Sequence, residues 1–410
     1  MTARLGDQDW LTSAATRAVF AALEAAGGSD CARFVGGSVR NALRGQAVDD
    51  IDIATTLEPE AAFAAIRKAG LKAVPTGLAH GTVTAVSGHR PYEITTLRRD
   101  VTTDGRNATV AFTDDWSEDA ARRDFRLNAL YADLTGRIYD PTGEGVADAL
   151  AGRVIFVGDP VTRIREDYLR ILRFFRFYAW YGREAPDAAA MAACAAEADG
   201  LSRLSAERVS KELMKLLTAP DPRRAVAAMD ETGVLAQVLP EAEAGAVFRR
   251  LCDLTPDPVL RLAGLVPADP DGLRALSVRL RLSNSVRDRL VAAAVAATAV
   301  RPEMSERTAR AAVYRLGGQA VRDGLMRHRA EGGGSPADLD RLEALIAGWT
   351  VPALPVGGRD LARLGVAPGP ETGRLLKAFE AGWIADDFPA GGHEARLRAL
   401  VDPAVSKPPG

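Results

Sequence analysis

The sequence is poor in the residues that build disulfide frameworks, thiolate metal sites and membrane spans. Only three cysteines occur in 410 residues, and they lie far apart, which excludes a disulfide framework and a thiolate cluster. None of the four histidines is followed by aspartate, so a His-Asp metal motif is absent. The polar N-terminus lacks the apolar segment of a secretory signal, and no run of about 18 uncharged apolar residues occurs. We therefore expect a cytoplasmic protein with no membrane-spanning segment.

A strong net charge is also lacking. The 52 basic residues nearly balance the 54 acidic ones, so a nucleic-acid partner would have to bind a local basic patch. The basic residues are nearly all arginine, which favours planar, two-pronged contacts to phosphates and bases. The hydrophobic fraction of 47% is that of an ordinary globular protein. At about 150 residues per domain, the length predicts two to four domains.

Residues 1–150 mix strand and helix patterns. Segments 50–56, 81–88 and 92–99 are rich in β-branched residues and predict strands, whereas 11–27 and 57–70 have helical spacing of apolar residues. The short apolar run before Gly36 predicts a further strand, and the residues after it predict one or two helical turns. These patterns predict a small α/β domain with one mixed sheet.

Helical patterns dominate from Arg163 to about residue 348. A cluster of proline and glycine then precedes a helix, a Pro-Gly-Pro turn and a second helix, and the end is expected to fray after Pro403. The fold class is therefore predicted as α+β. The patterns thus indicate an α/β domain in the first 150 residues, a helical region to about residue 348 and a small helical C-terminal module; the sequence gives no oligomeric state.

Asp50 and Asp52 are the strongest local signal for chemistry. Side chains two apart in a strand share a face, and two carboxylates there repel each other unless a cation lies between them. Such a pair suits two Mg²⁺ ions in phosphoryl transfer. An alternative is a pair of ordinary surface carboxylates. Glu93, on a later strand, is an auxiliary third carboxylate, unless it pairs with Arg98 or Arg99.

A glycine turn precedes the acidic pair. Gly36 and Gly37 follow an apolar strand and open a helix, a geometry in which backbone N–H groups approach a polyphosphate. Arg40 adds a fork of donors. The alternative is a tight turn with a surface arginine. No GxxxxGK[ST] motif occurs, so the turn is not a P-loop. The turn and the acidic pair together indicate a nucleotidyltransferase site.

Residues 122–130 form a second constellation. If this segment is helical, Asp124 and Asn128 lie one turn apart and could bind a ribose diol, while Arg123 reaches a phosphate. The alternative is a capped helix with a solvated salt bridge.

Asp167, Arg170, Arg173 and Arg176 recur every three residues in a helical pattern. An aspartate that accepts from an exocyclic amino group, beside an arginine that donates to a ring nitrogen, fits adenine and cytosine. Guanine and uracil present a carbonyl acceptor beside a ring N–H donor instead. Asp167 and Arg170 could therefore select ATP and CTP without a template. The alternative is an amphipathic helix with a solvated arginine face.

The motifs at 34–55, 122–131, 166–177 and 205–213 occur in an order that resembles the class II tRNA nucleotidyltransferases, the CCA-adding enzymes and their poly(A) polymerase relatives. Residues 358–376 resemble the tail segment of that family. The resemblance implies a catalytic nucleotidyltransferase head (1–150), a helical neck (151–217), a body (218–348) and a tail (349–410) that grip the tRNA acceptor arm.

The resemblance also implies roles for single residues. It implies metal binding by Asp50 and Asp52 and a helix in which Arg208 and Glu212 are structural, with Ser205 as its N-cap. The implied nucleotide-binding residues are Gly37, Arg40, Arg123, Asp124, Asp167, Arg170, Arg173 and Arg176. Residues 98–119 resemble the flexible loop used in switching from C to A addition, at full length. Asn41 and Arg126 depart from the usual Asp and Thr of the family.

The leading hypothesis is template-independent addition of CMP, CMP and AMP to the 3′ end of tRNA from CTP and ATP, with Mg²⁺ as cofactor. A poly(A) polymerase or an A-adding enzyme of the same family remains as an alternative. A non-catalytic RNA-binding protein is disfavoured because the acidic pair and the Asp167/Arg170 pair are intact. A small-molecule or protein nucleotidyltransferase would not need the long helical C-terminal half.

Overall fold

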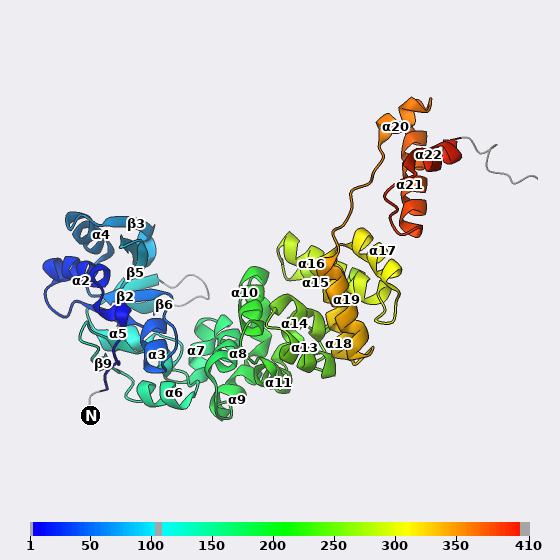
Figure 1. Cartoon of the computed structure of the whole chain (residues 1–410). Coiled ribbons are helices and arrows are strands. Elements are labelled where there is room, and N and C mark those ends of the chain that lie inside the picture. Colours follow the sequence, from blue (N-terminus) through cyan, green and yellow to red (C-terminus); the bar gives the residue numbers. More distant parts are fainter. Residues whose placement is uncertain (1–2, 103–108, 402–410) are drawn as a thin grey trace, which may run out of the picture. The chain divides into compact units, whose positions relative to one another are not determined.

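The computed structural model describes residues 3–102 and 109–401, which fall into two compact units, Met1–Ala244 and Gly245–Gly410 (Figure 1). The predicted α+β class is confirmed, because a mixed sheet occupies the N-terminal part and the described residues that follow are almost entirely helical. The four-part division stays a prediction. In the described ranges, no helix is both long and apolar enough to cross a membrane.

A seven-stranded sheet forms the centre of the first 150 residues, in the order β3-β4-β5-β2-β1-β8-β9. β2 and β5 are parallel, and the other neighbours are antiparallel. The strands predicted at 50–56, 81–88 and 92–99 are confirmed as β2, β4 and β5. The strands are Ala32–Val35 (β1), Ile51–Thr55 (β2), Lys72–Gly77 (β3), Thr82–Ser87 (β4), Arg90–Thr96 (β5), Tyr131–Ala132 (β8) and Ile138–Tyr139 (β9), with a separate hairpin of Arg98–Thr102 (β6) and Thr109–Phe112 (β7).

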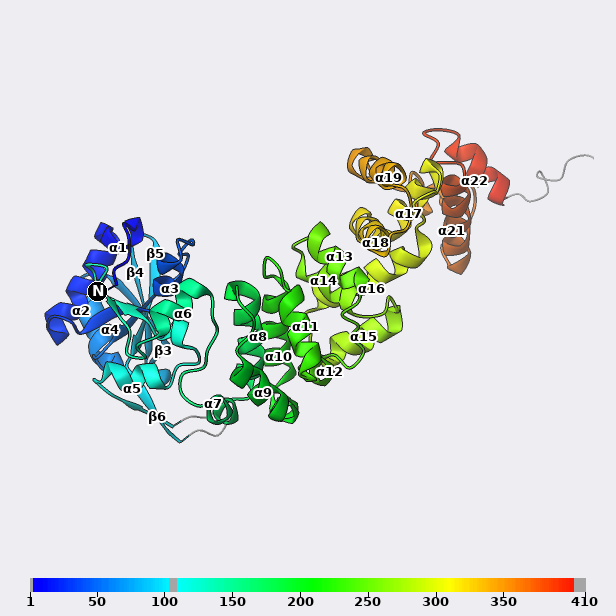
Figure 2. The ribbon, with the colours of Figure 1, turned by 90° about the horizontal axis from the view of Figure 1, so that it is seen from below.

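Two helices, α2 and α4, lie side by side on one face of this sheet (Figures 1 and 2). The helix predicted at 11–27 is broken at Ser13, because its side chain accepts a hydrogen bond from the Thr16 backbone N–H at 3.2 Å and so starts α2. The helices here are Asp9–Thr12 (α1), Ala14–Gly27 (α2), Gly37–Leu43 (α3), Pro59–Lys68 (α4), Trp116–Ala121 (α5) and Gly145–Ala151 (α6).

The helical part of the first unit begins with α7. The sequence predicts one helix from Arg163, but the chain is extended at Asp167, with φ −155° and ψ 105°. An Asp167 carboxylate oxygen accepts from the Leu169 backbone N–H at 3.1 Å, which favours a new helix start over continuation. The helices are Pro160–Glu166 (α7), Leu169–Tyr181 (α8), Ala188–Ala196 (α9), Ala206–Leu217 (α10), Arg223–Glu231 (α11) and Val234–Val238 (α12).

In the described residues, the second unit is built from helices alone. Helical structure reaches Gly348, as predicted, and the two helices predicted around the Pro-Gly-Pro turn are α20 and α21. A further helix, α22, was not predicted. The predicted frayed end lies outside the described residues. The helices are Ala246–Leu254 (α13), Pro258–Leu265 (α14), Pro270–Arg279 (α15), Asn284–Ala299 (α16), Glu306–Leu316 (α17), Gly318–Glu331 (α18), Pro336–Gly348 (α19), Gly358–Arg363 (α20), Pro370–Ala385 (α21) and His393–Val401 (α22).

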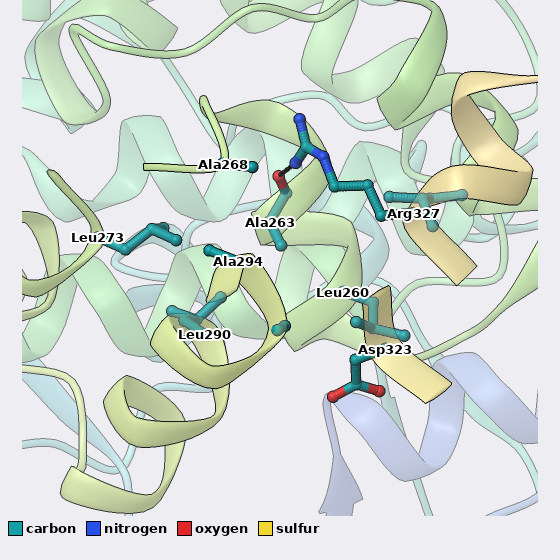
Figure 3. Close-up of a pocket in the computed structure, with 10 residues that line it drawn as sticks. Leu260, Ala263, Ala268, Leu273, Leu290, Ala294, Asp323 and Arg327 are labelled. Atoms are coloured by element: carbon teal, nitrogen blue, oxygen red, sulfur yellow. Dashed lines mark hydrogen bonds between the residues drawn. The ribbon is translucent and has the colours of Figure 1, made fainter. Parts of the chain in front are cut away.

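A small apolar cavity lies inside this second unit (Figure 3). Leu260, Leu273 and Leu290 line it, and the Arg327 guanidinium closes one side by donating to the Ala263 carbonyl at 2.8 Å. Its volume of about 10 Å³ is at the lower limit for one water molecule. This cavity is therefore a packing feature and not a ligand site.

Candidate active site

The glycine turn and the acidic strand lie at the same edge of the sheet. β1 and β2 are antiparallel, with Phe34 opposite Ile53, so the turn that follows β1 is next to the start of β2 and its Asp52. Gly36 has φ 67° and ψ −116°, a conformation that only glycine adopts without strain. α3 begins immediately after it, at Gly37, and directs its N-terminus toward this edge.

Three carboxylates gather beside the turn. Asp52 is opposite Glu93 of the parallel strand β5, and Asp50 directly precedes β2. Burial, followed by the negative charges of Glu93 and Asp50, raises the pKa of Asp52 to about 6, and Arg123 only partly opposes this shift. The placement of Glu93 next to Asp52 favours its interpretation as a third carboxylate.

This cluster fits a divalent cation that is shared with a substrate. Burial, together with the charges of Glu93 and Asp50, disfavours the ionised form of Asp52, and a cation would favour that form. No three His, Cys, Asp or Glu side chains form a ready-made metal cage in the part of the chain that the structure describes. Mg²⁺ is typically held by one or two carboxylates together with substrate phosphates and water, so an open pair of aspartates is the donor set it prefers.

The segment after α5 differs from the prediction. The helix that would place Asp124 and Asn128 one turn apart does not form: Phe125 makes a β-bridge with Phe156, and Arg126–Asn128 makes a short 3₁₀ turn. The bridge pulls the backbone out of helical geometry. Asp124 and Asn128 nevertheless meet, with Asn128 Nδ2 3.4 Å from Asp124 Oδ1.

Asp119 holds the two arginines of this segment, a role that sequence reasoning missed. Its carboxylate is 1% exposed and accepts from Arg122, Arg123 and the Tyr131 hydroxyl, with Arg123 Nη2 at 2.8 Å. Burial alone would raise the pKa of Asp119, but the charges of Arg123 and Arg122 outweigh it and lower the pKa to about 2. The three- and four-residue spacing to the arginines was the available signal in the sequence.

Arg40 joins the first helix of the site to the far end of α8. It is 5% exposed and donates to Asn128 Oδ1, to Asn41 Oδ1 at 2.9 Å and to the Tyr181 hydroxyl at 2.7 Å. Asn41, which replaces the usual Asp of the family, thus supplies a neutral acceptor for this buried guanidinium. Arg126, the second departure, turns to Glu144 and lies 3.9 Å from Asp148.

The predicted Asp167/Arg170 pair does not form a direct side-chain contact in this structure. The two residues are linked through the backbone, where the Arg170 N–H donates to the Asp167 carbonyl at 2.9 Å. The reason is the extended backbone at Asp167, which takes its side chain out of the helical row. Each member has its own partner: Asp167 pairs with Arg208, Arg170 with Glu166, Arg173 with Asp124, and Arg176 with Glu212.

Segment 122–124 connects the carboxylate cluster to the α8 row. Arg123 acts electrostatically on Asp52, and the Arg122 carbonyl accepts from Arg170 Nη2 at 3.3 Å. Asp124 Oδ2 accepts a hydrogen bond from Arg173 Nε at 2.9 Å. Segment 122–124 therefore contacts α8 on one side and acts on the carboxylate cluster on the other.

The loop predicted at 98–119 contains a hairpin and the start of a helix among its described residues. Its two sides pair as the hairpin β6-β7, residues 116–121 form α5, and residues 103–108 lie outside the described ranges. Arg122 Nε donates to the Arg98 carbonyl at 2.9 Å, which fixes the root of the hairpin to the site. Ser205 occupies the N-cap position of α10, as predicted, but its side chain makes no capping hydrogen bond.

We expect Asp119→Asn to lower the free energy of unfolding by about 3–5 kcal/mol at pH 7, because it leaves Arg122 and Arg123 without their buried counter-charge. Since the pKa of Asp119 is lowered to about 2, its stabilisation is complete above pH 4 and is lost as the pH falls toward 2. Urea unfolding should show a smaller difference from the parent protein at pH 3 than at pH 7. The exposed neighbour Asp114, changed to Asn, should show neither effect; an equal loss at both pH values for Asp119→Asn would contradict this account.

Gly36→Ala and Gly37→Ala should differ sharply in stability. Alanine at Gly36 meets a backbone conformation outside its range and should cost about 1–3 kcal/mol. At Gly37 a new Cβ would lie 3.8 Å from Arg40 Nη2, an ordinary contact, so the melting temperature should barely change. Equal melting temperatures for the two variants would show that the turn does not require glycine at position 36.

Two family models match the chain. Residues 32–155 match the model described as "Poly A polymerase head domain", and residues 186–245 match "Probable RNA and SrmB-binding site of polymerase A". The first includes the glycine turn, the carboxylate cluster and segment 122–124.

Relatives and solved structures extend the match to most of the chain. A mitochondrial CCA tRNA nucleotidyltransferase 1 of Mus musculus is 34% identical over 375 residues, which cover 86% of this chain and 82% of the relative. A CCA-adding enzyme of Levilactobacillus brevis is 31% identical, with 87% and 90% covered. The crystal structure of the Bacillus stearothermophilus CCA-adding enzyme in complex with CTP superposes with a TM-score of 0.77 at 26% identity, covering 96% of this chain and 99% of that one. The chain therefore belongs to the CCA tRNA nucleotidyltransferase family, the CCA-adding enzymes, and is a nucleotidyltransferase.

Proposed function

We propose that this chain adds CMP, CMP and AMP in turn to the 3′ end of tRNA, using CTP and ATP and no template. In this reaction the 3′ hydroxyl attacks the α-phosphate of the nucleotide, and pyrophosphate leaves. The observation that carries the proposal is the connection, through segment 122–124, between a carboxylate cluster suited to phosphoryl transfer and an Asp/Arg row suited to base reading. The near full-length similarity to CCA-adding enzymes supports it.

Asp50 and Asp52 are the proposed metal ligands, with Glu93 beside them. The raised pKa of Asp52 supports this role, because burial and then the charges of Glu93 and Asp50 disfavour the ionised carboxylate, and a bound cation would favour it. A bound Mg²⁺ would supply charge neutralisation for the phosphate oxygens. The all-oxygen donor set suits a hard cation, and Mg²⁺ is proposed because it is typically held by one or two carboxylates together with substrate phosphates.

The triphosphate is proposed to bind between the N-terminus of α3 and the arginines of the site. Backbone N–H groups from Gly37 onward face outward from the helix start, and Arg123 lies next to the turn, with Nη1 3.8 Å from the position of a Cβ on Gly36. Arg40 reaches a phosphate only by exchanging one of its contacts to Asn41, Asn128 or Tyr181. Asp124 and Arg123 are the proposed contacts to sugar and phosphate.

Base selection is proposed for Asp167 and Arg170, with Arg173 and Arg176 as further nucleotide contacts. Arg170 is now bound to Glu166 and to the Arg163 carbonyl, at 2.8 Å from the latter. It must exchange one of these acceptors for the ring nitrogen of the base. Adenine and cytosine then satisfy both side chains, whereas guanine and uracil leave them unpaired.

The helices of residues 218–401 are proposed to bind tRNA, since a nucleotidyltransferase for small substrates would not need them. The alternative of a poly(A) polymerase draws support from the description of the head-domain model, but that model covers residues 32–155 alone. The predicted cytoplasmic location stays a prediction, because the mouse relative is named as mitochondrial.

Incubation of the purified chain with tRNA lacking CCA, and with CTP and ATP singly and together, tests the proposal. We expect two CMP and then one AMP per tRNA. Absence of CMP incorporation would overturn the proposal, and extension by AMP alone would favour the poly(A) or A-adding alternative.

Asp52→Asn should lower the rate of incorporation by about 10³-fold or more, because it removes a charge from the metal site. The matched control is Asp49→Asn, an exposed acid just outside the cluster, which should retain the parent rate. A single-turnover assay at saturating CTP separates this loss from a change in nucleotide affinity. Full activity of Asp52→Asn would show that Asp52 is not a metal ligand.

A further inference from the structure

The helix α10 contacts the proposed base-reading row at both ends. Arg208 Nη2 lies 2.7 Å from Asp167 Oδ2, and Glu212 accepts from Arg176 Nε at 2.5 Å. Arg208 and Glu212 are four residues apart, so they project from the same face of α10. In both views α10 lies alongside α8 (Figures 1 and 2).

Asp167 depends on such a contact because it lies between helices. Its backbone is extended at the break between α7 and α8, so no helical geometry restrains its side chain. One carboxylate oxygen accepts from the Leu169 N–H at 3.1 Å, and the other receives Arg208. A contact on each oxygen fixes the plane of the carboxylate. A carboxylate offers about four lone-pair directions, so acceptor capacity is left for a base.

We propose that Arg208 is a specificity-determining positioning residue, which holds the Asp167 carboxylate toward the exocyclic group of the incoming base. The inference rests on the proposed function of Asp167 in reading that group. It assigns to Arg208 an effect on nucleotide choice and not only on the packing of α10.

The physical reason is that selection against uracil and guanine requires a carboxylate that cannot turn away. Both bases present a carbonyl oxygen where cytosine and adenine present an amino group. A fixed Asp167 then faces another acceptor, and the repulsion and the unpaired groups reject the base. Without Arg208, the Asp167 side chain could rotate about its χ angles and relieve that repulsion at small cost.

A purely structural role is a poorer explanation of this ion pair. The side chains of Arg208 and Asp167 are 27% and 23% exposed, and ion pairs that water reaches contribute little to stability. α10 is anchored independently by its buried apolar face, which includes Leu213, Leu216 and Leu217. Loss of Arg208 should therefore change selectivity more than folding.

The test is Arg208→Met, which keeps the length of the side chain and removes its charge. On tRNA lacking CCA, kcat/KM is measured for CTP and for UTP; on tRNA ending in CC, it is measured for ATP and for GTP. We expect each ratio of correct to incorrect nucleotide to fall about tenfold or more, the effect of losing a charged hydrogen bond. The melting temperature should change little, and Arg208→Lys should restore part of the selectivity.

Arg165→Met is the matched control. It removes an equivalent ion pair on the neighbouring helix α7, where Arg165 lies 2.8 Å from Glu197, and it should leave both ratios unchanged. If the parent protein adds no CMP, the proposed function fails. If the parent adds CCA and Arg208→Met keeps the parent ratios, only this inference fails. Should Arg208→Met not fold, unchanged ratios in Arg208→Lys and Arg208→Gln would overturn it equally.

Discussion

The ion pair between Asp124 and Arg173 is the interaction on which the arrangement of the site depends. Asp124 is 8% exposed, and a carboxylate in that position needs a cation close by. Burial alone would raise its pKa, but Arg173 outweighs this and lowers the pKa to about 2. Because Arg173 belongs to α8 and Asp124 lies in the chain between β7 and β8, their ion pair joins α8 to the part of the first unit that contains the sheet. The proposed base-reading residues of α8 thereby lie next to segment 122–124.

The carboxylates of the head divide into two electrostatic classes. Asp119 pairs with Arg122 and Arg123, and Asp124 pairs with Arg173, and these arginines outweigh burial and lower both pKa values to about 2. Asp52 lies among like charges, and its pKa is raised to about 6. A folded chain tolerates such a site where a cation is to be bound, since the ion reverses the local electrostatics. This contrast distinguishes Asp119 and Asp124, whose charge arginines already neutralise, from Asp52, whose charge a cation would neutralise.

The parts of the fold that depend on local pattern were predictable from the sequence. Alternating and β-branched segments predicted β2, β4 and β5, and the apolar run before Gly36 predicted β1, whose following turn lies beside the acidic strand. The helix break at Asp167 was missed because neither proline nor glycine marks it, and a side-chain hydrogen bond to Leu169 produces it instead.

The partners of the site residues were harder to predict because they are distant in sequence. Arg208 is 41 residues from Asp167, Glu212 is 36 residues from Arg176, and Tyr181 is 141 residues from Arg40. No periodicity connects positions so far apart, and only the packing of α8 on α10 and on the head brings them together. Asp119 is the exception, since its spacing to Arg123 could have been noticed.

A crystal structure of the chain with CTP and Mg²⁺ tests the central claim most directly. The account predicts one nucleotide that spans the site, with its triphosphate beside Asp50 and Asp52 and its base within hydrogen-bonding distance of Asp167 and Arg170. A nucleotide whose base lies away from α8 while its phosphates occupy the carboxylate cluster would contradict the account.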